Sequence, residues 1–169
     1  MSTQKMVIKK VGDYIIRRCV KEDLDQVISI NLTSLPEHYS NYFYEELLEN
    51  APEAFLVVEI NNKIVGYVMG RIEFGFSHTK FGFAKKGHIV SIAVLEEHRR
   101  KGLGLALMEE AVKGFIQRGC KEIFLEVRVS NIPAIHLYKK LGFVITSRHE
   151  RYYSDGEAAY QMSLFITNK

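Results

Sequence analysis

The apolar positions in the N-terminal third of the chain change their spacing, and each change marks a new element. Residues 14–18 are short and rich in β-branched side chains, which favours a strand. Over 22–32 the apolar side chains recur at helical spacing, and Pro36 ends this helix because the residue before a proline is pushed out of the α region. A second helix is predicted over 41–50.

The middle of the chain has the pattern of strands. Residues 54–60 and 64–73 are β-rich runs on either side of Asn61-Asn62, a pair that suits a two-residue hairpin turn with positive φ angles. Residues 74–86 mix glycines and aromatic residues with basic ones, so we expect a loop there.

The C-terminal half alternates between the strand and helix periods. We expect a strand over 88–94, a helix over 104–118, a strand over 122–129, a helix over 133–141, and strands over 143–153 and 158–165 around the turn Ser154-Asp155-Gly156. The predicted order is β-α-α-β-β-β-α-β-α-β-β, with about seven strands and about four helices. Antiparallel hairpins beside βα crossovers predict a mixed α/β (α+β) fold whose central sheet has both parallel and antiparallel strands.

Length and composition indicate one domain. The 169 residues are 47% apolar and 25% charged, which is enough to bury a core without disulfides. We expect a single domain over 1–169 with an ordered core from about 13 to 166. Cys19 and Cys120 form no metal-ligand spacing, and neither do the six histidines, so we expect no metal and two buried thiols in a reducing compartment.

Charge and the N-terminal sequence indicate which partners and which cellular location to expect. A formal charge of +3 and a pI of about 8.8 suit an anionic small ligand but are too weak to indicate nucleic-acid binding. No apolar leader follows Met1, and no stretch approaches membrane-spanning length. We therefore expect a cytoplasmic protein without membrane or nucleic-acid partners. Because the chain ends soon after its last predicted strand, we also expect a monomer that needs no auxiliary subunit.

The sharpest candidate for chemistry is the basic run Arg99-Arg100-Lys101-Gly102-Leu103-Gly104, between an apolar strand and an amphipathic helix. A pyrophosphate needs convergent N–H donors and a favourable field, and the first turn of a helix supplies both. Gly102 and Gly104 let the backbone approach the oxygens, and three cations add attraction. Taken alone, the run would be interpreted as a glycine turn with a solvated basic cluster.

A second motif follows about 30 residues later, and together the two resemble the acetyl-CoA signature of the GNAT acetyltransferase superfamily. The two motifs are Val90-Ser91-Ile92-Ala93-Val94 with Arg99-x-x-Gly102-x-Gly104, and Asn131-x-x-Ala134-x-x-Leu137-Tyr138-x-x-Leu141-Gly142-Phe143. The predicted element order is also the family's order, so the resemblance covers nearly the whole chain. Four further segments are similar to the catalytic subunit of NatA-type N-terminal acetyltransferases and its archaeal relatives: Leu35-Pro36-Glu37-His38-Tyr39, Lys86-Gly87-His88-Ile89-Val90-Ser91, Leu125-Glu126-Val127-Arg128 and Tyr152-Tyr153-Ser154-Asp155-Gly156-Glu157.

The resemblance implies a GNAT fold that transfers the acetyl group of acetyl-CoA to the free α-amino group of protein N-termini, nascent chains at the ribosome among them. The amine attacks directly in a ternary complex, so the site needs a base, oxyanion donors and an acid for the sulfur. The family implies that Ile92, Ala93 and Val94 supply backbone donors, that Tyr138 is the acid and that Asn131 binds the pantetheine arm. The simpler interpretations are a Tyr138 ring packed on the sheet and an Asn131 helix cap.

Three residues are candidates for the base. The resemblance implies a catalytic and substrate-sensing role for Glu37, in the loop between the first two helices. A histidine such as His88 ordinarily titrates near neutrality, and Glu126 shares a strand face with Arg128. If that face lines the cleft, Arg128 keeps Glu37 or Glu126 ionised. The simpler interpretations are a helix cap, a strand-end histidine and a surface ion pair, and a water relay through two of the three remains open.

The resemblance also implies which residues enclose the start of the substrate peptide: Leu35, Pro36, Glu37, Tyr39, Arg128, Tyr152 and Tyr153. Adjacent tyrosines are otherwise explained by packing on an edge strand. Two alternative functions remain. One is a GNAT enzyme for internal lysines or a small amine, which the Leu-Pro-Glu and Tyr-Tyr-Ser-Asp-Gly-Glu segments disfavour. The other is a non-catalytic acyl-CoA-binding or RNA-associated module, which Glu37, His88 and Tyr138 disfavour.

Overall fold

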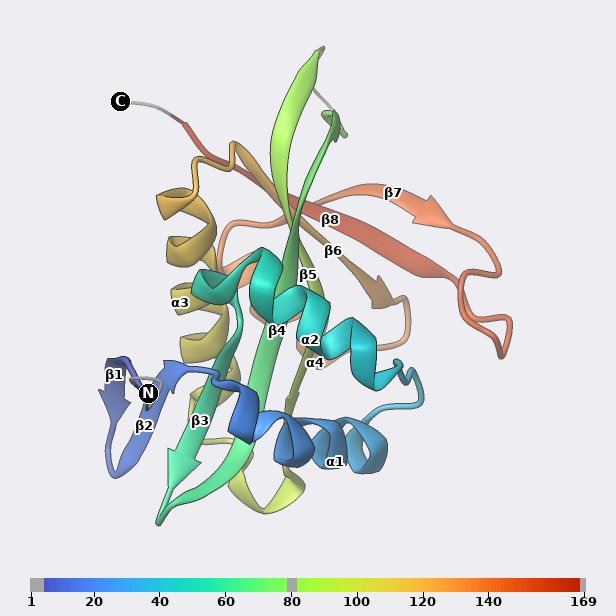
Figure 1. Ribbon diagram of the computed structural model, residues 1–169. Coiled ribbons are helices and arrows are strands. Elements are labelled where there is room, and N and C mark those ends of the chain that lie inside the picture. Colours follow the sequence, from blue (N-terminus) through green and yellow to red (C-terminus); the bar gives the residue numbers. More distant parts are fainter. Residues whose placement is uncertain (1–4, 79–81, 168–169) are drawn as a thin grey trace.

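The computed structural model describes residues 5–78 and 82–167, and its centre is one eight-stranded sheet (Figure 1). The strands are β1 (Val7–Val11), β2 (Tyr14–Arg18), β3 (Leu56–Ile60), β4 (Lys63–Phe76), β5 (Phe83–Val94), β6 (Glu122–Arg128), β7 (Val144–His149) and β8 (Ala159–Phe165). They lie in the order β1-β2-β3-β4-β5-β6-β8-β7. The β5–β6 pair is parallel and the other pairs are antiparallel, so the sheet is mixed, as predicted.

Four helices cover the two faces of the sheet: α1 (Leu24–Ser34), α2 (Asn41–Asn50), α3 (Leu103–Gln117) and α4 (Ile132–Lys140). One buried cluster takes its helical residues from α1 and α2, and the other takes them from α3 and α4. Phe115 of α3 lies so close to the sheet that a Cβ on Gly70 or Gly87 would lie 2.5 or 2.4 Å from its ring. Only glycine fits at these two positions of β4 and β5.

Local sequence signals are confirmed where a single residue decides the conformation. Leu35, the residue before the proline, is extended and ends α1. Asn61 and Asn62 have φ angles of 50° and 62°, as the β3–β4 hairpin turn requires. Cys19 and Cys120 are both buried and free. Within the described part of the chain, no helix is long and apolar enough to cross a membrane.

Three strand predictions need correction. The loop expected over 74–86 is wrong in most of its length, because β4 continues to Phe76 and β5 begins at Phe83, with Gly75 paired to Ala84. Figure 1 shows this hairpin projecting beyond the rest of the sheet. Strand β1 was not predicted, because four of its five residues are exposed and the run therefore has no apolar alternation. It is held as an edge strand by its pairing with β2. The strand predicted over 143–153 is shorter and ends at His149.

The site is created where β5 separates from β6. Within the described chain, the two strands pair only over Lys86–His88 against Glu122–Phe124. Beyond that point β6 continues against β8, whereas β5 continues against β4. The β4–β5 register shifts here, with Met69 opposite Ser91 and Gly70 opposite Ile89, so Val90 is the extra residue of a bulge. A wedge therefore opens between two strands that are neighbours in the sheet.

Candidate active site

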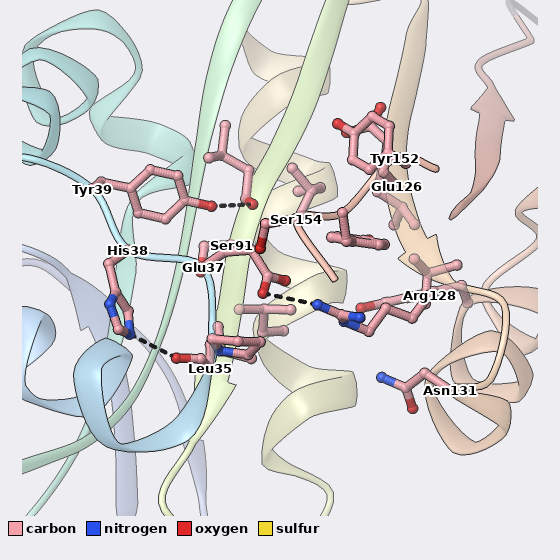
Figure 2. A pocket seen from close by; sticks show the side chains of 18 residues that line it. Leu35, Glu37, His38, Tyr39, Ser91, Glu126, Arg128, Asn131, Tyr152 and Ser154 are labelled. Atoms are coloured by element: carbon pink, nitrogen blue, oxygen red, sulfur yellow. Dashed lines mark hydrogen bonds and ion pairs between the residues drawn. The ribbon is translucent and has the colours of Figure 1, made fainter. Parts of the chain in front are cut away.

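The wedge between β5 and β6 contains a cavity of about 730 Å³ (Figure 2). Its wall includes residues from β5, β6, α4, the loop between α1 and α2, and the loop between β7 and β8. The predicted site residues that line it are Leu35, Pro36, Glu37, Tyr39, Ile92, Glu126, Arg128, Asn131, Tyr138, Tyr152 and Tyr153. The fold thus brings together most of the substrate and catalytic residues expected from four separate segments of the sequence.

Arg128 joins the two loops that flank the cavity. Its guanidinium lies 2.8 Å from Asp155 and 2.9 Å from Glu157, both in the β7–β8 loop, and 3.3 Å from Glu37 in the α1–α2 loop. It also lies over the Tyr153 ring, 4.1 Å from the centroid. The hydrogen bond that Arg128 donates to Glu157, followed by those that it donates to Asp155 and Glu37, raises the pKa of Arg128. Of the two carboxylates expected to pair with Arg128, the structure gives it Glu37, and Figure 2 shows the two side chains pointing toward one another.

His88 lies behind the cavity wall, between two carboxylates. Its Nδ1 is 2.8 Å from Glu73 and its Nε2 is 2.7 Å from Glu126, while the ring stacks on Phe124 with 4.3 Å between centroids. Burial lowers the pKa of His88, but the hydrogen bonds and charges of Glu126 and Glu73 outweigh it, so the net pKa is raised. Both ring nitrogens are engaged. His88 therefore reaches the cavity only through Glu126, which lines it.

The α1–α2 loop is held in place by a buried polar network that sequence reasoning missed. Asn31 of α1 is fully buried, and its amide donates to the carbonyl of Glu37 at 3.0 Å and to the hydroxyl of Tyr67 at 3.1 Å. The Tyr67 hydroxyl is in turn 2.7 Å from Ser91 Oγ on β5. The available signal was the position of Asn31, which falls where the helical spacing of α1 calls for an apolar residue.

Tyr39 supports the bulge of β5 from the same loop. Its ring stacks on Phe43 with 5.0 Å between centroids, and its hydroxyl is 3.5 Å from the carbonyl of Val90 (Figure 2). Burial raises the pKa of Tyr39 to about 12, so the hydroxyl keeps its proton near neutrality. Tyr39 is thus both a wall of the cavity and a contact to the strand that opens it.

Tyr138 and Asn131 lie on the α4 side of the cavity. Tyr138 is 8% exposed, and burial raises its pKa to about 12, so near neutral pH it is a proton donor. Its ring also packs in the core, so the packing interpretation holds alongside any chemical one. Asn131 accepts a bond from the Ala134 N–H at 3.3 Å and is the N-cap of α4, as the simpler interpretation predicted.

The basic run Arg99–Gly104 lies outside this cavity, at the start of α3. The helix begins at Leu103, which is 2% exposed, so its side chain is not available to a ligand. Gly102 has a φ of 78° with no atom within 4 Å of a Cβ built there, and a Cβ on Gly104 would meet only Leu137, at 4.0 Å. Packing within the chain therefore does not require glycine at 104. The open space beside both glycines, at the N-terminus of a helix, suits a phosphate group brought close to the backbone.

The remaining residues of the predicted acetyl-CoA signature frame this loop. Arg100 has a positive φ of 64°, Arg100 and Lys101 are exposed, and Arg99 uses its Nε to donate to the carbonyl of Val94 at 2.8 Å. Ala93 is 8% exposed and packs in the α1–α2 core, so, like Val94, it could offer only backbone atoms. In the described part of the chain, no group of three or more His, Cys, Asp or Glu side chains is arranged to hold a metal ion.

Comparison with known proteins gives a consistent result. Residues 24–143 match the model of the Acetyltransferase (GNAT) family. The chain is 49% identical over 158 residues to an N-alpha-acetyltransferase of Sulfurisphaera tokodaii, covering 92% of this chain and 95% of the relative. The crystal structure of Ard1 from Thermoplasma volcanium superimposes with a TM-score of 0.79 at 34% identity, covering 92% and 99% of the two chains. Arabidopsis thaliana Naa50, in complex with the bisubstrate analogue CoA-Ac-MVNAL, gives a TM-score of 0.77 at 25% identity, covering 91% and 99%.

Proposed function

Since this chain belongs to the GNAT acetyltransferase family, we propose that it transfers the acetyl group of acetyl-CoA to the free α-amino group of protein N-termini. The observation that carries the proposal is the wedge between β5 and β6, whose cavity is flanked by two loops that Arg128 ties together. The names of the relatives support it, because the Sulfurisphaera protein is an N-alpha-acetyltransferase and the Naa50 structure holds CoA joined to a peptide.

The chain offers separate places for the two substrates. The backbone N–H groups at the start of α3, with Arg99, Arg100 and Lys101 nearby, suit the phosphates of acetyl-CoA. Between that loop and the cavity, the edge of β5 that faces away from β4 is unpaired with β6 after His88 within the described chain. Its N–H groups near Val94 are therefore available to an oxyanion. Acetyl-CoA supplies the thioester that the amine attacks.

The residues around the cavity can handle the proton of the N-terminal ammonium. Glu126 lines the cavity and is hydrogen-bonded to His88, so this pair can take up the proton that the ammonium must lose. Tyr138, protonated near neutrality, can give a proton to the departing sulfur. We assign Glu37 to the first residue of the peptide, because its charge lies in the cavity wall and would attract the ammonium. Tyr152 and Tyr153 complete the wall on the β7–β8 side.

Release of CoA measures this reaction continuously. Both cysteines of the protein are buried and burial raises their pKa values, so a thiol reagent reports mainly the CoA released. We expect turnover with short peptides that begin with a free Ser, Ala or Met, and none with the same peptides after chemical blocking of the N-terminus. Equal turnover with free and blocked lysine-containing peptides would instead support an internal-lysine enzyme. Binding of acetyl-CoA without turnover on any amine would support a non-catalytic module.

The narrower expectations about partners remain predictions. The neighbouring structures with peptide analogues support a peptide substrate, but nascent chains at the ribosome, a monomeric state and a cytoplasmic location rest on the sequence alone.

A further inference from the structure

Three hydrogen-bonded side chains, one each from β6, β5 and β4, form a row from the cavity toward the surface. Glu126 lines the cavity, His88 lies behind it, and Glu73 of β4 closes the row with a side chain that is 29% exposed. The atom that His88 Nδ1 meets is Glu73 Oε2, at 2.8 Å. Arg71 donates to the same oxygen from Nε at 3.1 Å and from Nη2 at 3.0 Å. Glu73 contacts none of the substrate positions described above, so the acetyl-transfer reaction does not yet account for it.

We propose that Glu73 is a positioning residue of the acetyl transfer. Through His88 it sets the pH above which the His88–Glu126 pair accepts the proton of the substrate ammonium. The inference rests on the proposed function, in which that pair handles the proton. It goes beyond it by giving a role to a carboxylate that lies outside the cavity.

The two contacts of His88 limit how the pair can take up a proton. A neutral ring carries one N–H, so only one of its two contacts to carboxylates is a hydrogen bond and the other nitrogen has a lone pair that can take a proton. The substrate ammonium then gives one proton to the hydrogen-bonded Glu126–His88 pair and becomes the neutral amine, while the pair gains one positive charge. With the ring charged, both N–H groups are already donated, and the pair has lost most of its capacity as a base. Glu73 decides between the two states because it stabilises the charged ring.

The surroundings of His88 make Glu73 and Glu126 the dominant charges. Arg71 and Glu73 face it from β4 and Glu126 from β6, while Tyr152 lies against Glu126. His78 lies near Phe124, the ring on which His88 stacks, with 4.5 Å between the His78 and Phe124 centroids. Burial raises the pKa of Glu73, but the bonds from His88 and Arg71 outweigh it, so the net pKa is lowered and the carboxylate stays ionised. Geometry and charge therefore agree on an ionised Glu73 beside His88.

The test is the titration of His88 itself, followed by NMR and assigned by its loss in His88→Gln. In Glu73→Gln the amide keeps the shape of the side chain but removes its charge. The folded-state pKa of His88 is raised by its partners, so losing one of them should lower the midpoint by about one to two pH units, the scale of one charge-assisted hydrogen bond. The acid limb of kcat/KM for a Ser-starting peptide should move down in parallel. The plateau should fall roughly 3- to 10-fold, because a weaker base is left.

Two further variants make the result specific. Glu150→Gln is the matched control, because Glu150 also pairs with an arginine two residues earlier, Arg148, at 2.5 Å, and it is exposed. Glu150→Gln should change neither the midpoint of the His88 titration nor the acid limb of kcat/KM. Arg71→Gln removes the cation that shares Glu73 Oε2, so the His88 midpoint should rise. This second variant tests the proposal in the opposite direction even if Glu73→Gln folds poorly.

The outcomes separate this inference from the proposed function, because the titration needs no substrate. A His88 midpoint that is the same in wild type, Glu73→Gln and Arg71→Gln overturns the role of Glu73. Equal loss of activity at every pH, with an unmoved acid limb, also overturns it, since Glu73 would then be structural. A shifted midpoint in a protein that acetylates no peptide contradicts the proposed function instead.

Discussion

Asn31 is predicted to control peptide use without touching the peptide. Asn31→Ala removes an amide that donates to the Glu37 carbonyl and to the Tyr67 hydroxyl. Each hydrogen bond contributes about 0.5–1.5 kcal/mol net, so unfolding should become about 1–3 kcal/mol easier. For a chain of this length that lowers Tm by about 2–12 °C, and the fold survives because domains have about 5–15 kcal/mol of stability.

The functional effect should be selective for the peptide. If the hydrogen bond from Asn31 to the Glu37 carbonyl stabilises the transition state by its full net value, its loss lowers kcat/KM for a Ser-starting peptide about 2- to 12-fold. Calorimetry should give an unchanged Kd for acetyl-CoA, because Asn31 lies on α1, which packs into one core cluster, whereas Leu103 at the start of α3 belongs to the other. Thr33→Val is the control, since its hydroxyl bonds only to carbonyls of α1 itself. Peptide kcat/KM near the wild-type value in folded Asn31→Ala would refute the reasoning, and Asn31 would then only fill the core.

Three further substitutions test the assigned roles. Tyr138→Phe removes a buried proton donor, so kcat should fall roughly 10²- to 10⁴-fold at an unchanged acetyl-CoA Kd; a raised Kd with unchanged kcat would make Tyr138 a binding residue, and Tyr42→Phe, 74% exposed, serves as the control. Glu37→Gln should slow acetylation of Ser- and Ala-starting peptides more than that of peptides starting with Asp or Glu. The variant no longer repels an acidic first residue, so the kcat/KM values of the two peptide classes should come closer together. An unchanged ratio of these values would leave Glu37 as a structural partner of Arg128. Acetyl-CoA at a concentration of 100 times its Kd should stabilise the folded protein by about 2.7 kcal/mol and so raise Tm. Gly104→Glu should abolish this rise in Tm, and an unchanged rise would place the ligand elsewhere.

The sequence predicted the elements whose signals are local. Asn61-Asn62 needs positive φ angles and Pro36 cannot follow a helical residue, so both boundaries were correct. Strand β1 was missed because only Val11 of it packs against the core, and the far half of the β4–β5 hairpin was missed because its aromatic side chains are exposed. Phe74 and Phe76 are both more than 70% exposed, so no alternation marked their strand. Their conformation comes from pairing with Lys85 and Phe83 of β5, which the hydrophobic pattern does not record.

At the site, too, the contacts between side chains from different strands could not be predicted from the sequence. The resemblance to a family supplied Glu37 as a candidate base, residue type and strand alternation supplied His88, Glu126 and Arg128, and the fold places Glu37, Glu126 and Arg128 at the cavity. The sequence offered Glu37 as a partner of Arg128, but it did not supply the partners of His88. His88 lies between carboxylates 15 and 38 residues away, because strand register sets which side chains meet across β4, β5 and β6. The pairing changed the chemistry of His88, since a histidine with both nitrogens engaged is not the free base that its ordinary pKa suggested.

The position of the transferred acetyl group tests the central claim most directly. A peptide with a free N-terminal serine and one internal lysine is incubated with the protein and acetyl-CoA, and fragmentation by mass spectrometry locates the added group. The α-amine should carry it, the lysine should remain free, and the same peptide blocked at its N-terminus should not react. Acetylation of the lysine in both peptides would show that the cavity between β5 and β6 does not select a chain terminus.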